Sequence, residues 1–219
     1  MKKFITAFSL MIAASISAMA QYSADHNQAE FFIGYSNGQV DTGFEGFTSA
    51  NTGVGDRSTF HGFNASAVYN FGRYVGLKGD LSGTYNTTRF SFPVTTGTTT
   101  QTVSFDTNNS LYNFVGGVQI KDNSTEKTFK PFVHAMAGIG HGRTNVNNLT
   151  CTSTPLINCA QIINETATGF AAVLGGGLDI KVSDKIDIRA FQADYNPIVF
   201  DEGRGTTHNF RFGVGVVFK

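Results

Sequence analysis

His134, in the alternating stretch "KPFVHAMAGIGHGR", is the first residue of this sequence that could do chemistry. As a general base it would need a hydroxyl nucleophile within hydrogen-bond reach. A serine two residues after a histidine would lie on the same face of a strand. None of the five histidines is followed by serine at that spacing: His26, His61, His134, His141 and His208. We therefore expect His134 to be a packed interior residue, and the sequence predicts neither an enzyme nor a cofactor or metal site.

Five charged residues form a second group: Lys78, Asp80, Arg189, Asp194 and Arg211. They stand in segments where apolar residues occupy every second position, so in extended strands their side chains would avoid the apolar face. Inside a narrow closed barrel, long side chains fill the interior, and an unpaired buried charge carries a desolvation penalty of several kcal/mol. We therefore expect a paired charge cluster in which both arginines approach Asp80 or Asp194.

Eight period-two segments would position these residues, and no segment after the first twenty residues has a 3.6-residue period. The segments cover residues 29–39, 60–71, 74–85, 109–120, 130–143, 168–182, 185–196 and 207–218. Their connections alternate between short (72–73, 121–126, 183–184) and long (40–59, 86–108, 144–167, 197–206). This layout is typical of an even-numbered barrel with short periplasmic turns and long extracellular loops. The expected fold class is all-β, an eight-stranded antiparallel up-and-down transmembrane β-barrel.

The first twenty residues predict a secretory signal peptide. Lys2 and Lys3 precede a short apolar run, and Ala18 and Ala20 form a small-residue cleavage signature before Gln21. Residues 21–219 then form one barrel domain. Without the two leader lysines, 14 basic residues remain against 16 acidic residues, a net charge of −2. The basic surface that nucleic-acid binding requires is therefore missing, and we expect no nucleic-acid partner.

The composition of the two strand faces decides between a soluble and a membrane barrel. The apolar face carries almost no charge, for example at Phe170, Leu174 and Leu178, whereas the other face mixes glycines with long charged side chains. Aromatic residues lie near the strand ends, as in the interfacial belts of membrane barrels: Tyr69, Phe71, Tyr74, Tyr85, Tyr112, Tyr195 and Phe218. We expect the apolar face to contact lipid and the charged face to line the lumen.

The stretch "RAFQADY" contains a phase irregularity. Arg189 is polar at an odd position, whereas Gln192 and Asp194 are polar at even positions. A β-bulge near Ala190 and Phe191 would turn all three polar side chains toward the lumen.

Two cysteines, Cys151 and Cys159, lie in one long connection of an exported chain. An oxidising compartment favours a local disulfide between them.

Four stretches resemble the strand signatures of the bacterial outer-membrane β-barrel family of OmpA-like and opacity-type proteins. They are "GFNASAVYNFGRYVGLKGDLSGTY", "KPFVHAMAGIGHGR", "FAAVLGGGLDIKVSDKIDIRAFQADY" and "NFRFGVGVVFK". The resemblance implies an outer-membrane location, contact with outer-membrane lipid and lipopolysaccharide, and insertion by the barrel-assembly machinery. The last strand resembles the signal that this machinery reads, with Arg211, Gly213, Val216 and Phe218, although Lys219 follows the terminal aromatic residue.

The expected function is a structural or surface-interaction role, in which the long extracellular loops contact an external ligand and the charged cluster closes the lumen. A first alternative is a narrow porin for water or small solutes. A second alternative is a lipid-modifying enzyme, which lacks a recognisable pair of nucleophile and base.

Overall fold

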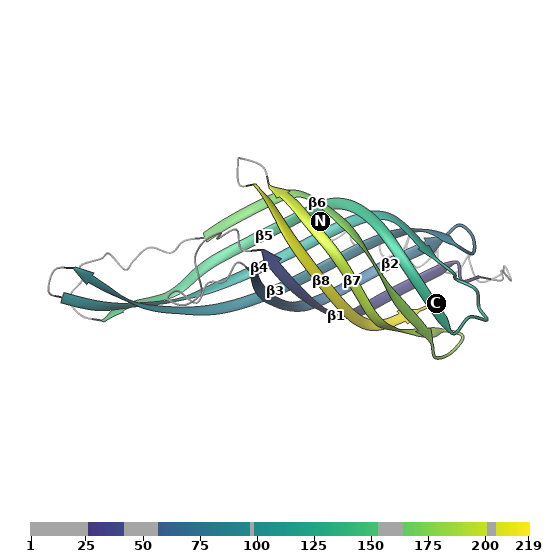
Figure 1. Ribbon diagram of the computed structural model, residues 1–219, viewed down its shortest axis with the longest axis horizontal. Coiled ribbons are helices and arrows are strands. Elements are labelled where there is room, and N and C mark those ends of the chain that lie inside the picture. Colours follow the sequence, from purple (N-terminus) through teal and green to yellow (C-terminus); the bar gives the residue numbers. More distant parts are fainter. Residues whose placement is uncertain (1–25, 42–56, 97–98, 153–163, 201–204) are drawn as a thin grey trace, which may run out of the picture.

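The chain folds into a closed barrel of eight antiparallel strands in the order β1 to β8, which confirms the expected fold class (Figure 1). The computed structural model describes residues 26–41, 57–96, 99–152, 164–200 and 205–219. The strands are β1 (Ala29–Asp41), β2 (Arg57–Asn70), β3 (Val75–Thr96), β4 (Thr99–Lys121), β5 (Phe129–Thr152), β6 (Asn164–Lys181), β7 (Ile186–Phe200) and β8 (Thr206–Phe218). Within these ranges, no helix is long and apolar enough to cross a membrane.

Alternation along each strand separates an apolar outer face from a mainly polar inner face. In β1, Phe31 and Ile33 are exposed, whereas Glu30 and Phe32 are buried in the interior. The barrel closes where β1 pairs with β8, and there a Cβ at Gly215 would collide with the backbone oxygen of Ile33. The outer face carries many large apolar side chains, as a surface in contact with lipid requires.

Two belts of aromatic residues delimit the apolar outer surface. Tyr69, Phe71 and Tyr74 are exposed near the short turns, which we call the turn end of the barrel. Tyr85 and Tyr112 are exposed toward the opposite end, the loop end. At 3.3 Å per residue and a tilt of about 40°, the strand from Tyr74 to Tyr85 spans roughly 28 Å. This height is close to the apolar band of about 25 Å in outer-membrane barrels.

Three strands are longer than the sequence predicted. Residues 86–108 were expected to form a loop, but β3 and β4 stay paired as far as Thr96 and Thr99. β5 likewise continues beside β4 to Thr152, through residues that were expected to belong to a loop. Figure 1 shows β3, β4 and β5 continuing well past the other strands. We call the part of these strands beyond Tyr85 and Tyr112 the projection.

Local chemistry explains why the projection forms strands. Its sequences "NTTRFSFPVTT" and "TTQTVSFDTNN" are rich in threonine and phenylalanine, which favour strands. Cross-strand pairs add to this preference: Arg89 donates two hydrogen bonds to Asp106, and the rings of Phe90 and Phe105 lie 5.2 Å apart. One face is polar, and the other carries Phe90, Val103 and Phe105 among threonines and asparagines, so the hydrophobic alternation is shorter here than in the other strands.

The pairing of β7 confirms the predicted β-bulge. The register of β7 against β8 shifts between Arg189 and Gln192, which leaves Ala190 and Phe191 unpaired with β8. Both residues are exposed, whereas Arg189, Gln192 and Asp194 are all buried in the lumen. The bulge therefore brings two polar runs of opposite phase onto one face.

Candidate functional site

The barrel interior contains a balanced set of buried charges. Among the described residues, five buried cations face five buried anions: Lys78, Lys121, Lys130, Arg189 and Arg211, with Glu30, Asp80, Asp179, Asp187 and Asp194. Every one of these ten residues is at most 5% exposed. All five residues of the predicted cluster lie in this group. The equal numbers matter because a buried charge without a partner is strongly destabilising.

Arg211 on β8 joins two carboxylates from different strands. Its Nη1 donates to Asp80 Oδ1 on β3 at 2.8 Å, and its Nε and Nη2 donate to Asp194 Oδ2 on β7 at 2.9 and 2.6 Å. Asn64 on β2 donates a further hydrogen bond to Asp80 at 2.8 Å. This arrangement ties four strands together across the lumen.

Arg189 pairs with a residue that the sequence reasoning did not include. Its guanidinium donates to both oxygens of Asp179, its neighbour across the β6–β7 ladder, at 2.8 and 3.1 Å. It reaches Asp194 only through Gln192, which accepts from Arg189 at 2.7 Å and donates to Asp194 at 2.6 Å. The guanidinium carbon also lies 4.2 Å from the ring centroids of Phe32 and Phe132. These two cation–π contacts hold the charge away from water.

His134 lies between Lys78 and Asp194. Lys78 Nζ is 3.2 Å from His134 Nδ1, and His134 Nε2 is 2.9 Å from Asp194 Oδ1. An ammonium can only donate, so Nδ1 accepts from Lys78 and Nε2–H donates to the carboxylate. Both ring nitrogens are thus engaged, and among the described residues no hydroxyl or thiol hydrogen-bonds to either of them. The geometry agrees with a packed interior histidine.

A second set of ion pairs lies at the turn end. Lys121 bridges Glu30 and Asp179, while Asp187 accepts from Lys130 at 3.1 Å and from Lys219 at 2.6 Å. Lys219, the departure from the family's terminal aromatic residue, therefore has a partner of opposite charge near the end of β8. Of the assembly-signal residues, Arg211 and Gly213 are buried, and Phe218 is exposed on the outer face.

The predicted cluster left out five of these buried charges, although Asp179 was expected on the charged face: Glu30, Lys121, Lys130, Asp179 and Asp187. Three of them stand next to the short turns, where a charge also fits a solvated connection. Their position in the alternation along each strand could have identified them as lumen-facing. Lys121, for example, is in step with the buried Val115 and Gln119 along β4.

An apolar cluster fills the interior toward the loop end. It consists of Phe60, Leu111, Val115, Met136, Ala171, Val173 and Ile198, with Val40 and Phe200 packed against it. The lumen thus changes from charged side chains at the turn end and middle to uncharged ones at the loop end, where this apolar cluster lies beside neutral polar side chains such as Asn113 and Asn196.

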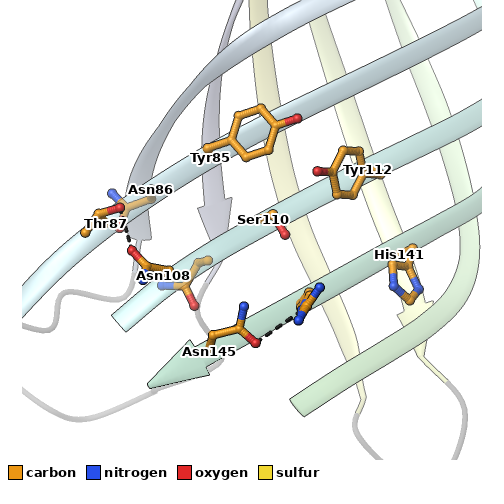
Figure 2. Close-up of a pocket in the computed structure, with 10 residues that line it drawn as sticks. Tyr85, Asn86, Thr87, Asn108, Ser110, Tyr112, His141 and Asn145 are labelled. Carbon is orange, nitrogen blue, oxygen red and sulfur yellow. Dashed lines mark hydrogen bonds between the residues drawn. The ribbon is translucent and has the colours of Figure 1, made fainter. Parts of the chain in front are cut away.

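A hollow of about 430 Å³ lies outside the lumen, at the base of the projection (Figure 2). Ten residues of β3, β4 and β5 line it: Tyr85, Asn86, Thr87, Asn108, Asn109, Ser110, Tyr112, His141, Arg143 and Asn145. None of them is acidic. No group of three or more His, Cys, Asp or Glu side chains that could hold a metal ion occurs in the described part of the chain.

Several expectations concern residues outside the described ranges. These are the leader of residues 1–20, Cys159 and the connections at 42–56, 153–163 and 201–204. Cys151 lies in β5, but its side chain is not described. The signal peptide and the Cys151–Cys159 disulfide remain predictions.

Comparison with known proteins places this fold among outer-membrane barrels. The model of the outer membrane protein beta-barrel domain family matches residues 6–218. Ail, the attachment invasion locus protein of Yersinia pestis, in complex with the heparin analogue sucrose octasulfate, is 19% identical with a TM-score of 0.52, over 87% of this chain and 97% of that one. OprG of Pseudomonas aeruginosa is 14% identical with a TM-score of 0.44, over 88% and 96% of the two chains. No curated protein matches this sequence significantly.

Proposed function

This chain belongs to the outer membrane protein β-barrel domain family, and from that membership we propose that it is a barrel with a closed lumen that interacts with external partners through its projection. Its location in the outer membrane follows from the family and from the fold. With short periplasmic turns and long extracellular loops, such a barrel directs its loop end away from the cell.

The observation that carries the proposal is the projection itself. Beyond the last pair of β3 with β2, eleven further residue pairs join β3 and β4, from Asn86 and Asn109 to Thr96 and Thr99. At 3.3 Å per residue this is roughly 36 Å of strand. A sheet of this length presents one face of hydroxyl, amide and charged side chains and one face that carries Phe90, Val103 and Phe105, which suits the recognition of another surface.

The interior supports a closed lumen. An eight-stranded barrel is only wide enough for its side chains to fill it, and here these side chains are ten buried charges, nine of them in ion pairs, followed by an apolar cluster. Moving an ion along this path would require it to displace Arg211 from two carboxylates and then to cross apolar side chains. We therefore expect no steady ion conductance.

Two experiments test this function. Purified full-length protein in planar bilayers should show no steady channel conductance. The second experiment uses a variant in which residues 88–107 are deleted and Thr87 is joined to Asn108 through a short Asn-Gly turn. Cells that display this variant should insert the barrel normally but lose attachment to surfaces and to one another. Steady conductance of the parent, or unchanged attachment after the deletion, would contradict the corresponding half of the proposal.

A narrow passage for water is a second candidate, because several interior polar atoms have no hydrogen-bond partner. Among the described residues these include both amide atoms of Gln119, Asn113 Oδ1 and Ser66 Oγ. Buried water satisfies such groups in many proteins. Stopped-flow shrinkage of proteoliposomes separates the candidates, since a water passage would accelerate it and a closed barrel would not. The second alternative, a lipid-modifying enzyme, would alter the lipid A mass spectrum of a deletion strain, and we expect no change.

A further inference from the structure

The outward hollow lies at the level where the barrel surface changes from apolar to polar. On β4, the next outward residue toward the turn end is Phe114, which is 69% exposed, and on β5 it is Ile139. Toward the loop end the outward residues are Ser110 and Arg143. Tyr85 and Tyr112, which line the hollow, belong to the aromatic belt at this boundary. A ligand in the hollow would therefore occupy the headgroup region of the outer leaflet.

Arg143 is the one cationic side chain among the residues that line the hollow, apart from His141 if it is protonated. Its Nε donates to Asn145 Oδ1 at 3.1 Å, and its two terminal nitrogens have no partner among the described residues. The nearby carboxylate of Asp106 is already engaged by Arg89 and Asn148. A guanidinium held at Nε, with both terminal nitrogens available, matches the bidentate geometry that phosphate requires.

The rest of the lining suits a sugar rather than a bare phosphate. The rings of Tyr85 and Tyr112 lie edge to face, with centroids 5.7 Å apart, and offer apolar faces beside hydroxyl groups. The Asn109 amide and the Asn108 amino group supply donors and an acceptor, whereas Asn86 already donates to the Thr59 carbonyl and accepts from Thr88. His141 is held by a hydrogen bond of 2.8 Å between its Nδ1 and Thr168 Oγ1 on β6. The volume of about 430 Å³ is within the range of small-ligand pockets.

A row of small residues crosses the lipid-facing surface on the turn-end side of the hollow. Gly79, Gly116, Ala137 and Ala172 are neighbours on four successive strands. A Cβ at Gly79 would meet no atom within 4 Å, and one at Gly116 would meet only a backbone oxygen at 3.7 Å. This row forms a low strip among large apolar side chains, in which acyl chains can lie against the barrel.

We propose that the hollow binds the phosphorylated sugar headgroup of an outer-leaflet glycolipid, with Arg143 on the phosphate, the tyrosines beside the sugar and the acyl chains along the row of small residues. The inference rests on the outer face of the barrel and requires neither a closed lumen nor an external partner. The glycolipid test can therefore fail while the proposed function holds, and the proposed function can fail while the glycolipid site is confirmed.

The test measures lipid binding by the full-length protein in detergent micelles. The probe is a hexa-acylated, bis-phosphorylated glucosamine disaccharide lipid, with phosphatidylglycerol and inorganic phosphate as comparisons. Arg143→Gln should weaken glycolipid binding at least about tenfold, the size expected when a charge-assisted pair of hydrogen bonds is lost. Arg57→Gln is the matched control. It removes the same charge from another exposed arginine at the loop end, which donates to the His208 carbonyl, and it should change binding less than about twofold.

A second variant acts on the lipid-facing strip. Gly79→Leu fills open space without a steric conflict, so the barrel should fold and still shift on an unboiled gel, while glycolipid binding weakens. Equal binding by the parent protein and by the Arg143→Gln variant would overturn the proposal. The proposal would also be overturned if phosphatidylglycerol or inorganic phosphate competed as well as the glycolipid, because the hollow would then recognise an anion alone.

Discussion

Replacing Asp80 with alanine tests whether the interior ion pairs stabilise the barrel. The Asp80 side chain has no exposed surface, and Arg211 Nη1 and Asn64 Nδ2 each donate to it at 2.8 Å. The variant loses two hydrogen bonds to a carboxylate, one from the Arg211 guanidinium and one from the Asn64 amide, and it leaves five buried cations against four anions. Removing one partner of a buried pair typically costs about 3–5 kcal/mol of unfolding free energy. Arg211 keeps its two hydrogen bonds to Asp194, so we expect a loss near 3 kcal/mol.

The same reasoning ranks a second variant. Asp194 accepts from Arg211, His134 and Gln192, so Asp194→Ala leaves four donor nitrogens of these three residues without their buried acceptor. It should therefore destabilise the barrel more than Asp80→Ala does, by roughly 4–5 kcal/mol. Asp184→Ala is the control, because this turn aspartate is 93% exposed and should give no measurable change.

The assay is reversible unfolding in urea with detergent or lipid present. The chain has no tryptophan, so the folded fraction is followed by circular dichroism and by the mobility of unboiled samples on gels. An Asp80→Ala barrel that unfolds at the same urea concentration as the parent would show that these charges are hydrated and contribute little. A larger loss for Asp80 than for Asp194 would refute the ranking.

Three further predictions concern the projection, the cysteines and the closed barrel. Hydrogen bonds from Arg89 and Asn148 lower the pKa of Asp106 to about 2. This carboxylate should therefore stabilise the projection above pH 4 and lose that effect only as the pH falls through about 2. A carboxyl NMR titration should show this midpoint, and Arg89→Ala should move it up toward the ordinary value near 3.9. Cys151 and Cys159 should form a disulfide that orders the third long connection and leaves the barrel intact; labelling of both thiols in protein purified without reductant would contradict it. The protein should fractionate with outer membranes and shift its gel mobility when boiled, because the closed hydrogen-bonded barrel resists detergent until heated; a soluble periplasmic species without a heat shift would contradict the membrane assignment.

The sequence predicted the orientation of the interior side chains better than their pairing. Alternation alone indicates that Asp80 and Arg211 face the lumen, and the phase slip in "RAFQADY" locates the bulge that brings Arg189, Gln192 and Asp194 to one face. Which charges meet depends on the stagger between strands, which a single sequence does not specify. Arg189 illustrates the difference, because its partner Asp179 is its direct neighbour across the ladder rather than a residue on the far side.

The strand ends were missed for two physical reasons, and the second also bears on the lumen. Alternation is visible only where the two faces of a strand differ in polarity. In the projection the alternation of Phe90, Phe92 and Val94 covers only five positions, includes Pro93 and lies in a run rich in threonine, so residues 86–96 resembled a loop. At the loop end of β7 both faces are apolar, with Ile198 in the interior cluster and Val199 exposed, so residues 197–200 read as a loop as well. The loss of contrast in β7 arises because the interior has changed from charged to apolar side chains. An apolar run on both faces at the end of an otherwise alternating strand therefore indicates an apolar layer inside the barrel, and such a layer opposes the passage of ions more strongly than paired charges alone.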